Sequence, residues 1–188
     1  MQNVLPNGFE LKILGDDNYI SQKHFNEFFK IIKDSFPKSE RRTKDAFYSL
    51  FKNESRYFAV SLLKNDEVVC FFTIWRLKNF YFGDHFATRA DMRNLKLGSI
   101  LLNYVKDMLD MPLVIEVEPD ENELTHRRME FYKRHGFVLN DFAYFLPPMM
   151  KGCKPLSMKI MSYPKEVQKD IICEIYESVY NTKKSCIF

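Results

Sequence analysis

The chain has 188 residues, of which 46% are apolar and 28% charged, with 18 Phe, 10 Tyr and only 6 Gly and 8 Pro. This composition excludes a collagen, a low-complexity linker and a charge-rich disordered chain, and the length indicates one domain with an appendage. The net charge of +3 is small and spread along the chain, so it indicates no partner by itself.

Cysteine spacing and hydropathy bear on metal content and location. The four cysteines form none of the close pairs typical of zinc sites or redox motifs: Cys70, Cys153, Cys173 and Cys186. Residues 1–8 lack the basic start and long apolar stretch of a signal peptide, and no run of about 18 apolar residues occurs. We therefore expect a cytoplasmic protein with reduced thiols, no metal and no membrane contact.

The first half of the chain predicts strands and two helices. Residues 9–14 alternate apolar and polar, as in a short strand. Ser21 is a candidate cap for a phenylalanine-lined helix that ends at Pro37, and Thr43 is a candidate cap for a shorter helix. Three runs of β-branched and aromatic residues then predict consecutive antiparallel strands: residues 57–63, 68–77 and 81–88.

The second half alternates helix and strand. The expected elements are a helix from Leu97 to Leu109, a strand at 113–117, a helix at about 121–134, and strands at 137–145 and 156–161. Gly136 is expected to end the second of these helices in a left-handed conformation. We expect a domain over residues 9–162, preceded by a tail at 1–8 and followed by a helix and tail at 163–188.

Residues 164–180 predict an amphipathic helix, because apolar residues recur four apart from Val167 to Val179. Such a helix can bind a partner or pair two subunits in a homodimer. The interpretation that it covers the domain's own core is favoured, since surface helices normally show this pattern.

The stretch 86–102 reads as a strand, a polar turn and an apolar helix. A helix start exposes backbone N–H donors at the positive end of its dipole, so the turn can hold a pyrophosphate. Gly98 would allow close approach, and Arg93, Lys96 and Ser99 would add charge or a hydroxyl. With one glycine, an ordinary strand-to-helix turn explains the stretch equally well.

A second motif, residues 128–137, follows the intervening strand. Together the two stretches resemble the GNAT superfamily of acetyl-CoA-dependent N-acyltransferases. Arg93 and Gly98 match the ends of the family's cofactor loop, and the second motif of that family, Phe-Tyr-x-x-x-Gly-Phe, is matched by Phe131, Tyr132, Gly136 and Phe137. Lys96 departs from the pattern, because a glycine is usual there.

Further short segments are similar to one bacterial branch of that superfamily, in the same order along the chain: residues 35–42, 84–87, 114–118 and 144–148. In that branch a glutamate is usual at the position of Asp84. The resemblance covers about residues 9–162 and leaves the terminal helix outside.

The resemblance implies an α/β fold with a mixed, mostly antiparallel sheet whose central parallel strands, about 81–88 and 113–118, splay to hold acetyl-CoA. The pantetheine would pair with the main chain of Phe86, Ala87 and Thr88. The pyrophosphate would meet the loop, whose cofactor-binding residues are Arg93, Asn94, Leu95, Lys96, Leu97, Gly98 and Ser99.

Direct acetyl transfer to an amine needs a base, a donor to the thioester oxygen, and an acid for the departing thiolate. The resemblance places the acid at Tyr132, and a phenol of pKa about 10 stays protonated at neutral pH. The candidate bases are Asp84, Glu116 and Glu118. Glu116 and Glu118 share one face of a strand, where two carboxylates would attract a cationic amine, although strand carboxylates are also often merely solvated.

Other polar residues have two interpretations each. His85 can act as a base, but packing or solvent exposure is favoured, and for His135 a helix-capping role is favoured. Arg41 and Arg42 can bind an acidic acceptor or the cofactor phosphates. They are equally compatible with a solvated turn.

The sequence therefore predicts a cytoplasmic N-acetyltransferase that acts on a primary amine. A small molecule and a peptide are both open as acceptor. A non-catalytic acyl-CoA-binding or regulatory module on the same fold is the alternative, indicated by Lys96. Nucleic-acid binding is not expected, because no basic stripe occurs.

Overall fold

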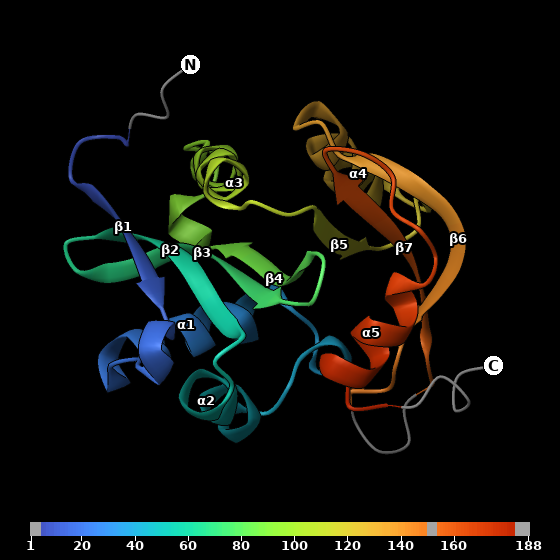
Figure 1. Cartoon of the computed structure of the whole chain (residues 1–188). Coiled ribbons are helices and arrows are strands. Elements are labelled where there is room, and N and C mark those ends of the chain that lie inside the picture. Colours follow the sequence, from blue (N-terminus) through green and yellow to red (C-terminus); the bar gives the residue numbers. More distant parts are fainter. Residues whose placement is uncertain (1–4, 150–153, 183–188) are drawn as a thin grey trace. The chain divides into compact units, whose positions relative to one another are not determined.

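The computed structural model describes residues 5–149 and 154–182, so Cys153, Cys186 and the lysines at 183–184 lie outside the described residues (Figure 1). The chain forms two compact units. The first comprises the residues up to Trp75 together with Asp84–Met108, and the second comprises Arg76–Gly83 together with the residues from Leu109 onward.

Seven strands form the sheet in the order β1-β2-β3-β4-β5-β7-β6. Their bounds are Phe9–Leu14 (β1), Tyr57–Lys64 (β2), Glu67–Arg76 (β3), Tyr81–Thr88 (β4), Leu113–Val117 (β5), Val138–Leu146 (β6) and Leu156–Tyr163 (β7). The pairs β1–β2, β2–β3, β5–β7 and β6–β7 are antiparallel, and β4–β5 is parallel. This confirms the predicted mixed, mostly antiparallel sheet.

Helices α1 (Gln22–Ser35) and α2 (Lys44–Asn53) begin where the sequence predicts. The hydroxyl of Ser21 accepts a hydrogen bond from the His24 amide at 3.2 Å, and that of Thr43 accepts one from the Ala46 amide at 3.2 Å. Each cap satisfies an amide that has no partner inside the helix.

Helices cover both faces of the strands in the first unit, with α1 and α2 on one face and α3 (Leu97–Met108) on the other (Figure 1). For this reason β2 and β3 are buried along almost their whole length rather than alternating. The predicted phenylalanine face of α1 enters this core, where the Phe28 ring lies 4.5 Å from that of Phe71 and 5.2 Å from that of Phe51.

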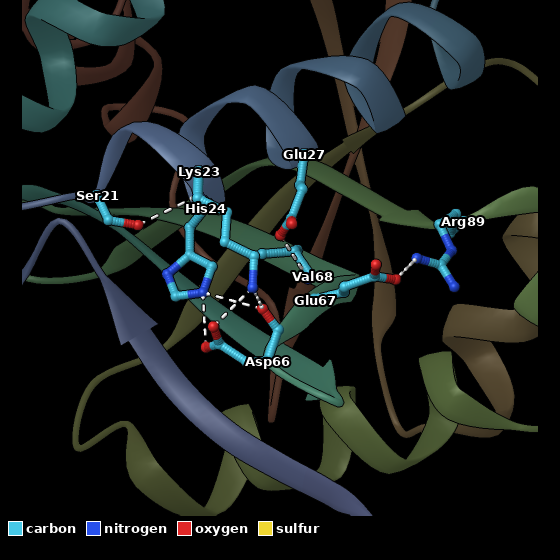
Figure 2. A network of polar contacts seen from close by, with 8 residues as sticks. All are labelled: Ser21, Lys23, His24, Glu27, Asp66, Glu67, Val68 and Arg89. Carbon is cyan, nitrogen blue, oxygen red and sulfur yellow. Dashed lines mark hydrogen bonds and ion pairs between the residues drawn. The ribbon is translucent and has the colours of Figure 1, made fainter.

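A polar network ties α1 to the turn between β2 and β3 (Figure 2). Asp66 accepts from Lys23 Nζ at 2.6 Å and lies 3.0 Å from His24 Nε2, while Glu27 accepts from the amide of Val68 at 3.0 Å. The neighbouring Glu67 pairs with the guanidinium of Arg89 at 2.8 Å. The network thus extends to the residue that follows β4, where the predicted cofactor loop begins.

In the second unit, α4 (Glu123–Arg134) starts at a capping box on Asn122 and ends before Gly136. The φ of Gly136 is 85°, as the sequence predicts, and an added Cβ would lie 3.3 Å from the Tyr163 ring. Both the backbone conformation and the space therefore favour glycine at this position.

The C-terminal helix is shorter than predicted. Helix α5 spans Ile171–Ser178, whereas residues 164–170 are not helical. The amide of Val167 donates to Asn140 Oδ1 at 2.9 Å, and the carbonyl of Lys165 accepts from Ser162 Oγ at 2.8 Å, so β6 and β7 satisfy these backbone groups in place of a helical turn. Ile172, Ile175, Tyr176 and Val179 are buried, as the core-covering interpretation predicts.

None of the helices in the described residues has the length and apolar character that a membrane span requires.

Candidate active site

The predicted cofactor loop joins β4 to α3 in the first unit. After the short 3-10 turn Ala90–Met92, Asn94 and Lys96 adopt positive φ values of 64° and 59°. The amide of Ile100 donates to the carbonyl of Lys96 at 3.0 Å, which makes Lys96 the N-cap residue, directly before the helix. The amides of Leu97, Gly98 and Ser99 therefore form the first turn, where a helix has N–H groups without intrahelical partners.

Lys96 takes the left-handed conformation that a glycine adopts readily. A side chain in this region costs about 1 kcal/mol relative to the right-handed conformation. The departure from the family pattern thus changes the residue and keeps a glycine-like backbone.

The remaining predicted cofactor residues surround this turn. Phe86 stacks on Phe72 at 4.8 Å, Ala87 is buried, and the Thr88 hydroxyl lies 3.2 Å from the Cys70 sulfur. Arg93 is exposed and donates to the Thr88 carbonyl at 3.4 Å. The exposed side chains of the loop itself are Asn94, Leu95 and Lys96, whereas Leu97 is buried and Gly98 and Ser99 are half-buried. The loop presents two cations near a helix start, a combination that suits an anionic group.

Asp84 lies on β4 with its side chain only 4% exposed. Its Oδ2 accepts from the Arg42 guanidinium at 2.5 Å and lies 3.5 Å from the indole nitrogen of Trp75. Burial on its own raises the pKa of Asp84, but Arg42 and then His85 more than offset it, so the pKa is held well below its usual value. A carboxylate stabilised in this way is a weak base.

His85 is packed rather than solvated. Its ring lies 4.8 Å from Phe36 and 5.3 Å from Phe47, and its Nε2 lies 3.2 Å from the Glu40 carbonyl. This confirms the favoured packing interpretation. The other ring nitrogen, Nδ1, lies 3.1 Å from Asp84 Oδ1, so the ring joins the ion pair to the segment between α1 and α2.

Tyr132 lies on the last turn of α4, where the end of the helix fixes its position. Gly136 turns the chain, the Phe137 amide donates to the Tyr132 carbonyl at 3.1 Å, and the two rings lie 5.4 Å apart. Burial raises the pKa of Tyr132, so the phenol is protonated at neutral pH. Within residues 5–149 and 154–182 its hydroxyl makes no hydrogen bond. His135, beside it, is the C-cap residue that the sequence favours.

Glu116 lies on β5 and accepts two phenol hydrogen bonds on a single oxygen. The Tyr144 hydroxyl donates to Oε1, and the Tyr180 hydroxyl donates to the same atom at 2.8 Å. Burial, followed by the nearby charge of Glu116, raises the pKa of Tyr144, so this phenol stays a donor. The third candidate base, Glu118, pairs instead with Arg128 on α4.

Sequence reasoning missed three of these partners. The sequence predicts a ligand or solvent as the partner of Arg42, and it connects neither Tyr144 nor Tyr180 with Glu116. One signal for Arg42 was present, since a lone acid in an otherwise apolar strand such as β4 requires a compensating cation when it is buried.

Comparison with known proteins shows the family. The model of the GNAT acetyltransferase family matches residues 25–137. A solved structure assigned to that family, from Bacteroides thetaiotaomicron, is 30% identical with a TM-score of 0.80, covering 85% of this chain and 93% of the other. The chain therefore belongs to the GNAT acetyltransferase family.

More distant structures share the fold. The ribosomal-protein-S18-alanine N-acetyltransferase of Escherichia coli is 17% identical with a TM-score of 0.60, covering 86% of this chain and 98% of its own. Arabidopsis thaliana Naa50, in complex with the bisubstrate analogue CoA-Ac-MVNAL, is 18% identical with a TM-score of 0.60. The match covers 85% of this chain and 99% of the Naa50 chain. No curated protein matches the chain significantly.

Proposed function

We propose that this acetyltransferase transfers the acetyl group of acetyl-CoA to a primary amine by direct attack. The observation that carries the proposal is Tyr132, a phenol that is kept protonated and whose hydroxyl is not engaged by the described residues. Such a group is able to protonate a departing thiolate. Membership of the family and the CoA-containing ligand of Naa50 support acetyl-CoA as the donor.

The loop residues fit the diphosphate of a CoA molecule. The first-turn amides of Leu97, Gly98 and Ser99 are suited to phosphate oxygens, and the exposed Arg93 and Lys96 carry compensating charge. The left-handed backbone of Lys96 weakens the alternative of a loop that has lost its binding geometry.

The reaction assigns one task to each group. The amine nitrogen forms a bond to the acetyl carbon, the carbon–sulfur bond breaks, and the thiolate takes the Tyr132 proton, which the nitrogen replaces with its second proton as the amide forms. The proton lost by the ammonium passes to a carboxylate, directly or through water. Glu116 is the favoured base, because two phenols orient it from β6 and the segment after α5, whereas Asp84 forms a buried pair with Arg42 and Glu118 pairs with Arg128.

We place this reaction in the cytoplasm. Cys70 and Cys173 are free thiols, and burial raises the pKa of Cys70 to about 12, so it is no nucleophile. Free thiols are typical of a reducing compartment.

Calorimetric titration with acetyl-CoA tests the donor site. We expect micromolar binding by the native chain and its loss in Gly98→Trp, which fills the first turn of α3. Met108→Trp places the same side chain at the opposite, exposed end of that helix and should bind normally. Equal binding by all three proteins would remove the loop from the cofactor site.

Turnover is tested by thiol release with four amines, which are spermidine, kanamycin, free lysine and a peptide with an unblocked N-terminus. With the amine that reacts, Tyr132→Phe should lower kcat about 100-fold and leave acetyl-CoA binding within about twofold. Unchanged kcat would dismiss Tyr132 as the acid. Binding of acetyl-CoA without turnover of any amine would favour the non-catalytic module.

A further inference from the structure

The segment that follows α5 places a side chain on the sheet. Tyr180 lies two residues beyond the end of the helix, and its hydroxyl donates to Glu116 Oε1, 64 residues earlier in the sequence, at 2.8 Å. Its ring also meets that of Phe82 edge-on at 6.4 Å. The family match ends at residue 137, so this contact comes from outside the matched segment.

Helix α5, drawn in red in Figure 1, is held in place by contacts other than the one to Glu116. The Tyr176 ring stacks on that of Tyr144 at 5.6 Å and 22°, and its hydroxyl donates to the Phe145 carbonyl at 2.9 Å. Two residues before Tyr176, Glu174 accepts from the Lys78 amide at 2.7 Å. The amide of Thr182 donates to the Tyr176 carbonyl at 2.8 Å, which curls the chain around Tyr180. The position of the Tyr180 hydroxyl is thus imposed by the helix.

Two neutral donors on one carboxylate oxygen have a specific electrostatic effect. Each hydrogen bond stabilises the ionised form of Glu116, yet neither phenol cancels its negative charge. The two phenols therefore orient the carboxylate and bring no opposite charge of their own beside it.

We propose that Tyr180 is a positioning residue for the acceptor-side carboxylate, through which the C-terminal segment takes part in acetyl transfer. It acts through Glu116 and does not touch the reacting atoms. This rests on the proposed function, in which Glu116 takes the proton of the amine.

The contact is tested first without any substrate, by carbon-13 NMR titration of the glutamate carboxyls, with the Glu116 signal assigned from Glu116→Gln. Tyr180→Phe should move the Glu116 midpoint up by about one pH unit, because a donor to the charged form is lost. Tyr48→Phe is the control. It removes one phenol hydroxyl from α2, where the Tyr48 ring packs on Phe25, and should leave the midpoint unchanged. An unmoved midpoint in Tyr180→Phe, or equal shifts in both variants, would overturn the proposal.

The catalytic role is tested with the amine that reacts. Tyr180→Phe should lower kcat/KM for the amine about fivefold to tenfold, because the lost orientation of Glu116 outweighs its higher proton affinity. The KM for acetyl-CoA should stay unchanged, and in the Glu116→Gln background Tyr180→Phe should have no further effect. A loss that persists in that background would show a structural role and overturn the proposal. If Glu116→Gln itself keeps full turnover, Glu116 is not the base. In that case both the assignment of Glu116 as the base and the positioning role of Tyr180 are wrong. The NMR shift still shows whether the Tyr180 hydroxyl donates to Glu116.

Discussion

Asp84 and Glu116 occupy two contrasting environments, although the sequence offers them as equal candidates for the base. Asp84 lies almost fully buried against a guanidinium and an imidazole ring. Glu116 is half-buried, with two phenol hydroxyls on one oxygen. One carboxylate has a cation as its partner, and the other has neutral donors.

The difference separates structural from chemical use of a carboxylate. A buried ion pair lowers proton affinity and ties two segments together, because breaking it leaves a charge without a partner. Neutral donors hold a carboxylate in place without removing its charge. We therefore expect Asp84 to matter mainly for folding and Glu116 mainly for turnover.

Asp84→Asn tests the first half of this comparison and should have the largest effect. It removes the charge of the Asp84 carboxylate from beside the Arg42 guanidinium, which is only 11% exposed, so the free energy of unfolding should fall by about 3–5 kcal/mol. Urea unfolding measures this change.

Asp66→Asn is the matched control, because Asp66 also pairs with a cation but is 64% exposed. An exposed pair contributes about 0–1 kcal/mol. If Asp84→Asn were no more costly than this control and yet abolished turnover, Asp84 would be the base and the comparison would reverse.

Glu116→Gln tests the second half. The amide oxygen still accepts from a phenol but takes no proton, so kcat should fall about 100-fold while the free energy of unfolding changes by less than about 1 kcal/mol. Steady-state kinetics and urea unfolding on the same preparation check both numbers. Glu118→Gln is the control, with an expected loss below about threefold, and a larger loss there would move the base to Glu118.

The pH dependence of stability gives a third contrast. Because the folded pKa of Asp84 lies below its ordinary value of 3.8, its contribution is fully present above that value and is lost as the pH falls through the folded pKa. The stability difference between the native chain and Asp84→Asn should be flat above about pH 5 and should narrow below about pH 4. A difference that stays flat below about pH 4 would show that Asp84 does not carry this pH dependence.

The parts of the fold that could be predicted from the sequence are local. The caps at Ser21 and Thr43 and the turn at Gly136 depend on neighbours within a few residues, and the structure confirms all three. The predicted length of the C-terminal helix is wrong, because the Val167 amide donates its hydrogen bond to Asn140, 27 residues earlier in the sequence. The spacing of apolar residues in the C-terminal segment gives no sign of this long-range hydrogen bond.

The same difference between local and long-range features holds for the candidate site. Arg93, Gly98 and Tyr132 belong to short motifs, and the structure shows a helix start and a fixed helix end at those motifs, while their roles stay predictions. The partners of the carboxylates are separated from them by 42 residues for Arg42, 28 for Tyr144 and 64 for Tyr180. Such pairs depend on strand order, which a single sequence does not contain.

Tyr144→Phe should have the smallest effect, and it gives the finest test of the contrast between Asp84 and Glu116. Removing this hydroxyl leaves Glu116 with Tyr180 as a donor, so the free energy of unfolding should fall by only about 1 kcal/mol and kcat by less than about tenfold. The loss of stability should be well below that caused by Asp84→Asn, and the loss of kcat well below that caused by Glu116→Gln. Urea unfolding and steady-state kinetics measure both. A loss of 3 kcal/mol or more, about that of a broken buried ion pair, would show that the phenols act as a single coupled unit with Glu116. Neutral donors would then constrain a carboxylate as tightly as a guanidinium does.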